Sequence, residues 1–368
     1  MKRTTGGSKV KCDLQAFPQA LTIGIDLGDR FSHYCILDHD GRVIEEGRIK
    51  MTREELRVHF ENLSPARIAM EAGTQSAWVS QMLESFGHEV LVANPSRIPG
   101  ISRSDNKADP IDAERLARYA RLDPQVLSPI CHRTEDAQMD LSLIRVRDRF
   151  VAARTMLINV ARGIVKSFGQ RLPCCDANAF ANKSKAHLPP KLADVLSPLL
   201  DQVAALTAQI KKYDCAVEEL AKTKYPETGV MLGIGGVGVL TAMTYVLTLG
   251  DPKRFGKSRD VGCYLGLRPR RSQSGGHDPQ LGITKAGNRY LRKTLVQSAQ
   301  YMLGHFGRDC VLRRWGQKLA ERGGKNAKKR AIVAVARKLA VLLHRLWITQ
   351  QPYDPFYGIT REPAASVS

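Results

Sequence analysis

The chain of 368 residues is long enough to bury two or three cores, and its formal net charge of +20 is unevenly distributed. Residues 251–350 contain 23 Lys and Arg against 5 Asp and Glu, a net of +18, whereas residues 21–250 contain 28 of each. This imbalance predicts a polyanionic partner for the C-terminal part, and nucleic acid is favoured over an anionic membrane because no amphipathic or lipidated anchor is visible.

The N-terminal segment, the apolar runs and the cysteines predict the cellular compartment of the protein. Residues 1–20 form a basic polar leader without an apolar segment, and no apolar run reaches 18 residues, so neither secretion nor membrane insertion is expected. The 8 cysteines show no CxxC pair and no histidine at zinc-ligand spacing. We therefore expect reduced thiols in a cytoplasmic protein without a membrane partner.

The first predicted domain covers residues 21–128 and contains both strands and helices. The predicted strands cover residues 21–26, 32–37, 43–49, 67–70 and 88–93, with a tight turn at Asp40-Gly41. A capping box of Thr52 and Glu55 begins one helix, and Trp78, Met82 and Phe86 mark the apolar face of another. Three strands in hairpin order followed by alternating helices and strands are typical of a ribonuclease H-like α/β fold, since a doubly wound nucleotide-binding sheet would begin with βαβ.

Four acidic residues stand at the ends of these elements. Asp26 and Glu71 each end a predicted strand, and Asp109 and Asp112 lie on the first turn of a helix that Pro110 opens. A carboxylate at the end of a core strand is costly to desolvate unless it is paired or coordinates a cation. The four together predict a divalent-metal site, and helix capping by Asp109 and Asp112 is the alternative.

Residues 129–225 are predicted to form a helical hairpin whose two apolar seams pack in coiled-coil fashion. Pairing within one chain and dimerisation through the same stripe are both open. The first seam contains Leu143, Val146, Phe150, Ala153, Leu157, Val160 and Ile164, and the second contains Leu196, Leu199, Val203, Leu206, Ile210, Tyr213, Val217 and Leu220.

Residues 226–348 form the predicted basic C-terminal domain, which is mainly helical, and residues 349–368 a disordered tail. The segment Leu232–Ala242 resembles a helix-hairpin-helix turn, in which Gly236 and Gly238 would bring backbone N–H groups close to phosphate; a tight helix junction is the alternative. Two helices follow, with Leu291, Leu295 and Met302 inward in the first, and Ile332, Val335, Leu339, Leu342 and Leu346 inward in the second.

A serine-containing loop lies between these segments. Ser272 and Ser274 follow Arg268, Arg270 and Arg271 and precede a glycine pair. Such a loop serves as a nucleophile or a phosphate clamp, or is only a flexible basic loop. A protease-like triad is not indicated, because His277 is the only histidine nearby.

Five segments in order resemble the motifs of the DEDD transposases of the insertion-sequence-110 group. They are Ile25–Gly28, Met70–Gly73, Lys107–Ala113, Gly266–Gly275 and Ile283–Arg289. The resemblance implies a recombinase with a RuvC-like N-terminal domain, a coiled-coil spacer and a C-terminal transposase domain.

By this resemblance Asp26, Glu71, Asp109 and Asp112 would hold Mg²⁺, and Ser274 would attack DNA to form a covalent phosphoserine link. Gln273 replaces the first of two hydroxyl residues that many members have, so Ser274 is favoured over Ser272. The implied partners are donor and target DNA, a structured guide RNA, and further copies in a dimer or tetramer. We hypothesise that the metal of the first domain activates Ser274, in cis or in trans. The residues expected to contact nucleic acid are Gly236, Gly238, Arg268, Arg270, Arg271, Lys285, Arg289, Arg292 and Lys293.

Three other functions remain open from the sequence. A RuvC-like metal nuclease or junction resolvase would use water as nucleophile and leave no protein–DNA adduct. An actin-like ATPase would use Asp26-Leu27-Gly28 at a phosphate but needs a second glycine-rich loop, which is not found. A non-catalytic nucleic-acid scaffold would bind without magnesium-dependent activity.

Overall fold

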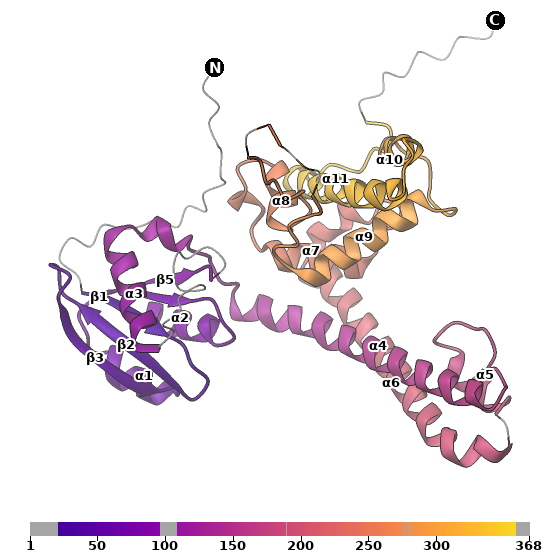
Figure 1. The fold of residues 1–368 in the computed structure, drawn as a ribbon, viewed down its shortest axis with the longest axis horizontal. Helices are drawn as coiled ribbons and strands as arrows, with labels where there is room; N and C mark the ends of the chain where they lie inside the picture. The colour runs from indigo at the N-terminus through magenta and orange to yellow at the C-terminus, as the bar shows by residue number, and fades with distance from the viewer. Residues whose placement is uncertain are drawn as a thin grey trace, which may run out of the picture. The chain divides into compact units, whose positions relative to one another are not determined.

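The computed structural model describes residues 21–95, 109–188, 190–274, 276–277, 279 and 281–357 (Figure 1). The predicted leader 1–20, Lys107 and Ala108 of the third acidic motif, Gly275 and positions 358–368 of the predicted tail lie outside the described residues. The chain divides into two compact units, Met1–Glu135 and Asp136–Ser368. No described helix is long and apolar enough to cross a membrane.

The first unit is built on a five-stranded sheet with the strand order β3-β2-β1-β4-β5. The β1–β2 and β2–β3 pairs are antiparallel, whereas β1–β4 and β4–β5 are parallel. The predicted strands are confirmed within one residue at most ends. Their bounds are β1 Thr22–Asp26, β2 Phe31–Leu37, β3 Val43–Lys50, β4 Arg67–Glu71 and β5 Glu89–Ala93.

Helices cover both faces of this sheet. Alternate strand residues such as Ile23 and Ile25 pack with α1 (Arg53–Phe60) and α2 (Ser76–Ser85). The opposite face packs against α3 (Asp109–Leu122), whose Ala113 and Ala117 contact Cys35 and Leu37. The short helix η1 (Pro124–Leu127) follows. The central strands β1 and β4 are therefore buried on both sides, as their near-continuous apolar residues predict, whereas the edge strand β3 is largely exposed.

Two long antiparallel helices begin the second unit, α4 (Glu135–Ser167) and α6 (Pro190–Thr223), with the short α5 (Phe180–Lys185) near their far end (Figure 1). Leu141 near the start of α4 packs with Val217 near the end of α6, and Val165 packs with Leu192. Most predicted seam positions of α6 are buried or half-buried, and Leu196, Val203, Ile210 and Val217 are buried.

The predicted seam of α4 lies at the border of the buried face of the helix. Five of its seven residues are half-buried, and Phe150 contacts Tyr213 of the α6 seam with ring centres 5.4 Å apart. Val146 and Val160 of that seam are exposed, and the buried stripe contains Leu141, Ile144, Asp148, Arg154, Ile158, Ala161 and Val165. The buried residues of α4 also include Asp140, so three of them are charged, and their apolar periodicity is weaker in the sequence than that of the neighbouring positions. Hydrophobicity alone therefore places the seam about one residue away from the most buried positions.

Helices surround one core in the rest of the second unit. The bounds are η2 Pro226–Met231, α7 Val239–Leu249, η3 Pro252–Arg254, α8 Arg259–Tyr264, α9 Arg289–Leu303, α10 Val311–Glu321 and α11 Ala327–Thr349. Tyr245, Leu295 and Leu339 are fully buried in this core. The inward faces predicted for α9 and α11 are confirmed in most positions, and α10 is a helix that the sequence reasoning missed. Met243 of α7 also packs with Ile144 of α4, so the helix pair and the C-terminal helices share a core.

Candidate active site and nucleic-acid-binding surfaces

Asp26 and Glu71 are the last residues of neighbouring parallel strands. The register of β1 and β4 pairs Ile25 with Met70, so the residues that follow them lie side by side at one edge of the sheet. Both side chains are half-buried. The strand order thus brings together two carboxylates that are 45 residues apart in the sequence.

A glycine in β1 allows α3 to lie against the sheet. A Cβ atom on Gly24 would lie 1.9 Å from the Ala113 carbonyl oxygen and 2.6 Å from the Ala117 nitrogen. No real Cβ makes such contacts, so any side chain at this position would displace the helix. The close approach determines where the first turn of α3, with Asp109 and Asp112, lies relative to β1.

His33 connects Asp109 to the same sheet edge. The β1–β2 register pairs His33 with Asp26, and the Nδ1 atom of His33 lies 3.8 Å from Oδ2 of Asp109. The Asp109 side chain is 64% exposed, so this contact is a weak, solvent-screened one. It nevertheless shows that α3 begins beside the strand end that carries Asp26.

Asp112 is the most buried of the four acids. Its side chain is 5% exposed, and Oδ1 lies 3.4 Å from Nη1 of Arg115. Its position in the first turn of α3 also stabilises the negative charge through the helix dipole. One long ion pair and a dipole are modest compensation for a carboxylate this deeply buried.

The four carboxylates suit a divalent cation in their chemistry, since Mg²⁺ and Ca²⁺ prefer oxygen ligands. Among the residues that the structure describes, no three His, Cys, Asp or Glu side chains gather closely enough to hold a metal ion. The donor type and the common sheet edge therefore fit such an ion, while the described side chains do not form a closed set of ligands.

The loop after β1 is held by Gln75, which the sequence analysis missed. Its Nε2 donates to the carbonyl oxygens of Gly28 and Asp29 at 3.0 and 2.9 Å. The Gly28 N–H donates to Oγ of Ser32 at 3.1 Å, and a Cβ on Gly28 would lie 2.0 Å from the Phe31 carbonyl oxygen. These contacts fix the backbone after Asp26 against the start of α2.

His132 is a second residue near this edge that the sequence did not reveal. Its Nε2 lies 2.9 Å from Oγ of Ser76, and that hydroxyl also accepts from the Gly73 N–H at 2.9 Å. Burial, and secondarily the neighbouring Arg133, lower the pKa of His132. Gly73 follows Glu71 by two residues, so the neutral imidazole supports the backbone after that acid. A single histidine in a loop carries no motif, which is why pattern reasoning passed over it.

The serine-containing loop ends in a tight turn. The Ser274 N–H donates to the His277 carbonyl oxygen at 3.2 Å, and the His277 N–H donates back at 3.1 Å. Ser272 and Ser274 are both exposed. The turn therefore presents Ser274 to solvent, where a large substrate has access to it.

Backbone hydrogen bonds join the two sides of this loop into a stalk. The Arg270 N–H donates to the Gly282 carbonyl oxygen at 2.9 Å, and the Thr284 N–H donates to the Arg268 carbonyl oxygen at 2.9 Å. We call the described residues 266–274 and 281–287 the stalk, and Gly266 and Gly287 at its base have positive φ values of 67° and 69°.

The base of the stalk is closely packed. A Cβ on Gly266 would lie 2.2 Å from the Ala286 nitrogen, and one on Gly287 would lie 2.2 Å from the Tyr264 carbonyl oxygen. Arg292 of α9 donates to the Gly287 carbonyl oxygen at 3.0 Å and to that of Leu265 at 3.3 Å. Arg292 therefore has a structural role at the base of the stalk, in addition to the nucleic-acid contact that the sequence predicts.

The glycine-rich turn before α7 lies against α9. Gly236 has a φ of 91°, and a Cβ there would lie 2.9 Å from Cδ1 of Tyr301. Gly238 caps α7 without a side-chain hydrogen bond. The close contact with α9 explains why position 236 is a glycine, as expected if this turn is a tight helix junction. Gly238 has no such steric reason, because nothing lies within 4 Å of a Cβ at that position.

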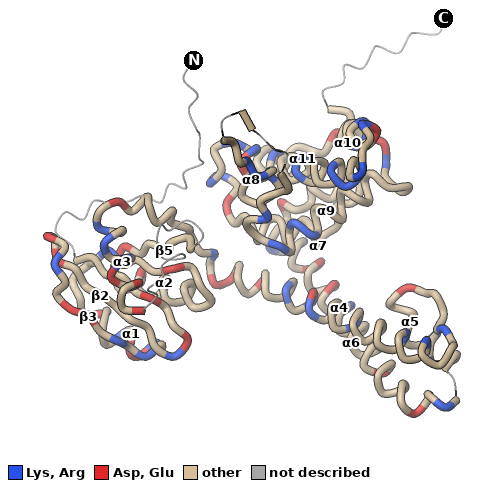
Figure 2. The backbone as a smooth tube through the Cα atoms, viewed as in Figure 1, with Lys and Arg blue, Asp and Glu red and all other residues tan. Residues whose placement is uncertain are grey.

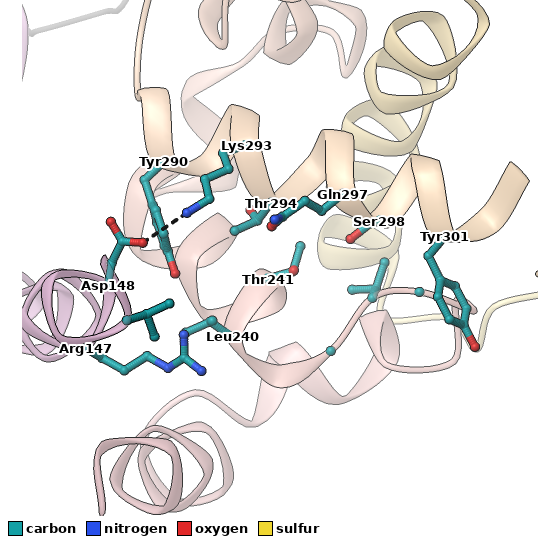
Figure 3. Close-up of a pocket in the computed structure, with 14 residues that line it drawn as sticks. Arg147, Asp148, Leu240, Thr241, Tyr290, Lys293, Thr294, Gln297, Ser298 and Tyr301 are labelled. Atoms are coloured by element: carbon teal, nitrogen blue, oxygen red, sulfur yellow. Dashed lines mark hydrogen bonds and ion pairs between the residues drawn. The ribbon is translucent and has the colours of Figure 1, made fainter. Parts of the chain in front are cut away.

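A pocket of about 570 Å³ opens between this turn, α4 and α9 (Figure 3). Lys293 is aimed toward Asp148 of α4, and their Nζ and Oδ1 atoms lie 3.2 Å apart (Figure 3). Arg147 donates to Asp214 at 2.7 Å. The cations of this pocket are therefore already paired with carboxylates of the protein.

The other predicted nucleic-acid contacts are exposed on the stalk or at the start of α9. They are Arg268, Arg270, Arg271, Lys285 and Arg289. Figure 2 shows more Lys and Arg than Asp and Glu along the part of the chain from α8 to α11. The second unit thus carries the positive surface and the serine, and the first unit carries the four acids.

Comparison with known proteins identifies the chain. A model of the DEDD transposases of IS110, described as Transposase, matches residues 23–169, and a second, described as Transposase IS116/IS110/IS902 family, matches residues 230–311. The transposase for insertion sequence element IS1328 of Yersinia enterocolitica is 32% identical over 77% of this chain and 84% of its own length. This chain belongs to the IS110 family of transposases.

Other relatives of this transposase cover most of its length. The transposase for insertion sequence element IS1111A of Coxiella burnetii (strain RSA 493 / Nine Mile phase I) is 29% identical over 90% of both chains. The pilin gene-inverting protein of Moraxella lacunata is 25% identical over 90% of this chain and 97% of its own. The predicted family is confirmed, and with it a DNA transposase or recombinase whose substrate is DNA.

The two matched segments contain the candidate residues of the transposase. Asp26, Glu71, Asp109 and Asp112 lie within the first, and Ser274 lies within the second. Membership of the DEDD transposases implies dependence on a divalent metal ion.

Proposed function

We propose that this transposase cuts and rejoins DNA strands with Ser274 as nucleophile and with Asp26, Glu71, Asp109 and Asp112 as ligands of Mg²⁺. The observation that carries the proposal is the shared sheet edge at which β1, β4 and the first turn of α3 present their acids. An exposed serine at the tip of a closely packed basic stalk supplies the second part.

The topology of the first unit supports a ribonuclease H-like, RuvC-like domain. Three antiparallel strands lie on one side of the sheet, and two parallel strands follow on the other side of β1. In this arrangement the central strand ends in an acid, which is the position of Asp26. The helix pair α4 and α6 has the length expected of a coiled-coil spacer.

The burial of Asp112 favours metal binding over simple helix capping. A capping acid is effective at the solvent-exposed end of a helix and needs no burial. A side chain that is only 5% exposed, with one ion pair at 3.4 Å, is better explained by a cation than by the helix dipole. When bound, a divalent ion stabilises phosphate charge and lowers the pKa of a coordinated hydroxyl.

In the proposed reaction the Ser274 oxygen attacks a DNA phosphorus and loses its proton. A P–Oγ bond forms, one P–O bond of the strand breaks, and the departing DNA oxygen takes up a proton. Attack by the hydroxyl end of another strand then reverses these bond changes and regenerates the serine. Because each step exchanges one phosphodiester for another, rejoining needs no external energy source.

The basic residues supply substrate binding in this proposal. Arg268, Arg270 and Arg271 contact phosphates near Ser274, and Lys285, Arg289, Arg292 and Lys293 extend this contact toward α9. Gly236 and Gly238 contribute backbone N–H groups at the start of α7. The net charge of +18 over residues 251–350 is in keeping with a structured guide RNA as well as DNA, bound by a dimer or tetramer.

Replacement of the serine tests the proposal directly. We expect Ser274→Ala to lower strand joining by on the order of 10³-fold or more and to abolish the covalent protein–DNA adduct on a denaturing gel, while DNA binding is retained. Ser272→Ala, which removes a hydroxyl two residues away on the same exposed loop, is the matched control and should leave the adduct intact.

A different result would favour hydrolysis by water. If Ser274→Ala still cuts DNA at the normal rate and the unmodified protein yields only free strand ends, the serine is not the nucleophile. The stalk would then only bind phosphate, and the protein would act as a metal-dependent nuclease or junction resolvase.

A further inference from the structure

The second unit contains a groove whose lining residues, apart from Arg268, have no role in the function proposed above. It has a volume of about 770 Å³ and lies between α8, α10, α11 and residues 353–357, which follow α11. We call it the α11 groove. Its base is formed mainly by Val311, Leu312, Val341, Leu342 and Tyr353. In Figure 1 the helices α8, α10 and α11 lie together in this unit.

Five cationic side chains line the groove. They are Arg259, Arg268, Arg337, Lys338 and Arg345, and all five are exposed. Within the described part of the chain, none of them forms an ion pair with a carboxylate, although Lys338 lies over the Trp315 ring with Nζ 3.8 Å from the ring centre. Asp354 is the one acid in the lining, and its Oδ1 accepts a hydrogen bond from the Phe356 N–H at 2.9 Å instead.

Other cations of the same unit are neutralised by neighbouring carboxylates. Lys224 lies 2.7 Å from Asp140, and Arg314 lies 2.5 Å from Asp309. The pocket beside α9 follows the same pattern with Lys293 and Asp148. Cations that converge on one groove without such partners repel one another, and an external polyanion removes that repulsion. The contrast therefore indicates that the partner of the α11 groove is anionic.

The apolar and aromatic residues of the groove indicate that the anionic partner also has an apolar, flat group. Tyr353 lies in the lining, and the Arg345 guanidinium lies 4.2 Å from the ring centre of Tyr357. Aliphatic and aromatic surface flanked by cations suits an unstacked nucleobase whose phosphates contact the rim. In a double-stranded nucleic acid the bases are stacked inside the helix, so only its sugar-phosphate backbone could contact this apolar surface.

We propose that the α11 groove binds a short stretch of single-stranded nucleic acid, with phosphates on the arginine and lysine rim and a base on the apolar floor. The proposal rests on the membership in the transposase family only for the presence of nucleic acid, and it does not depend on Ser274 or on the four acids. DNA and RNA share this chemistry, and the probes below distinguish them.

A native cysteine in the groove permits a test on the full-length chain. Cys263 lines the α11 groove and is exposed, while Cys174 and Cys215 are exposed elsewhere in the same unit. We expect oligo(dT) or oligo(rU) to slow maleimide labelling of Cys263 at least 5-fold and to leave the other two unchanged. Mass spectrometry of the labelled peptides measures each rate.

Each probe in the labelling experiment has a defined meaning. Stronger protection by oligo(dT) identifies a DNA strand, and stronger protection by oligo(rU) identifies RNA. Equal protection by a blunt duplex of the same length, or by polyglutamate of the same charge, would overturn the proposal, because neither offers an unstacked base. Absence of protection by both oligonucleotides would overturn it as well.

Paired substitutions provide the second test. Arg259→Gln with Arg345→Gln removes one cation from α8 and one from α11, whereas Lys211→Gln with Lys212→Gln removes two exposed cations from α6. We expect the first pair to weaken oligonucleotide binding about 10-fold and to lower the slope of log K against log salt by about 1.4, since each phosphate contact contributes about 0.7. The control pair should stay within about 2-fold. Equal losses of oligonucleotide affinity in both pairs would show a non-specific charge effect and would contradict binding in the α11 groove.

Both tests use protein that carries Ser274→Ala, so that no strand chemistry intervenes. Circular dichroism of each variant verifies that it is folded. If Ser274 proves not to be the nucleophile, Cys263 protection is unaffected. If the groove binds no nucleic acid, protein that retains Ser274 still forms the covalent adduct. The failures of the two proposals are therefore distinguishable.

Discussion

At the scale of single residues, glycines determine the geometry of both candidate sites. Gly24 allows the backbone of α3 to touch β1, and Gly266 and Gly287 allow the two halves of the stalk to meet. In each case a neighbouring main-chain atom occupies the space that a Cβ would need. Gly24 and the motif glycines Gly266 and Gly287 thus have identifiable steric reasons, independent of any contact with a ligand.

Gly24 provides a stability prediction. We expect Gly24→Ala to reduce the free energy of unfolding of the first unit by about 2 kcal/mol or more, because the new methyl group overlaps the Ala113 carbonyl and forces α3 away from the sheet. Gly73→Ala is the control, since nothing lies within 4 Å of a Cβ there. Urea titration of both variants measures the difference, and similar midpoints would contradict the assigned contact.

At the scale of elements, polar contacts decide how α4 lies on its neighbours. Arg154 donates to Asn178 at 2.8 Å and to Thr207 of α6 at 3.2 Å, and Asp140 accepts from the Tyr225 hydroxyl at 2.6 Å. A buried polar network constrains the relative position of two helices more strongly than an apolar stripe does. These contacts explain why charged side chains are among the most deeply buried residues of α4, while its regularly apolar positions are mostly half-buried.

His344 connects α11 to the elements before α9. Its Nε2 donates to the Pro252 carbonyl oxygen at 2.9 Å, and its Nδ1 lies 3.0 Å from Oγ of Ser258. The side chain is fully buried. Burial lowers the pKa of His344, and the hydrogen bond to Pro252 opposes this shift with a smaller effect.

The lowered pKa of His344 predicts a pH-dependent stability. Because the folded pKa lies below the unfolded value of about 6.5, the imidazole binds its proton more tightly in the unfolded chain. Its stabilising contribution is fully present above pH 6.5 and decreases as the pH falls through the folded pKa. We expect His344→Asn to lower the unfolding free energy by about 1–3 kcal/mol at pH 7.5 and by less at pH 5. Urea titrations of the second unit's unfolding at both pH values test this.

An exposed histidine of the same unit is the control for this experiment. His305→Asn should leave the unfolding free energy nearly unchanged at both pH values, because His305 is exposed. If the deficit of His344→Asn is equal at pH 7.5 and pH 5, protonation of His344 does not contribute to the pH dependence.

At the scale of the whole molecule, acidic and basic functions belong to different compact units. The four acids lie in the unit Met1–Glu135, and the segment 251–350 with a net charge of +18 lies in the unit Asp136–Ser368. Electrostatic attraction to phosphates therefore comes mainly from the second unit. This division separates binding from the proposed metal chemistry.

The division predicts the behaviour of variants in the acidic cluster. Asp26→Asn should abolish strand joining and the covalent adduct, yet leave the affinity for DNA and its salt dependence within about 2-fold, since no cation of the second unit changes. Val43→Thr, at an exposed position of β3, is a control that should leave all three properties intact. A large loss of DNA affinity in Asp26→Asn would contradict the separation.

The strands and the main helices of the first unit could be predicted because their patterns are local. Period-two and period-3.6 apolar residues, the Asp40-Gly41 turn and the Thr52 cap are each visible within a few residues. Gln75, His132 and the lining of the α11 groove could not be predicted, because each depends on contacts between residues that are distant in the chain. The helix α10 was missed although Leu312, Trp315 and Leu319 recur in it at helical spacing.

The sequence by itself determined the charge distribution, the element types and the five motifs of the family, because composition and local periodicity need no knowledge of long-range packing. Only the tertiary structure decided which residues of α4 are most deeply buried, that Gly24 allows α3 to lie beside Asp26, and that five cations line one groove without an ion pair to any described carboxylate. These features depend on which distant segments touch, and that is set by the shape of the packed core.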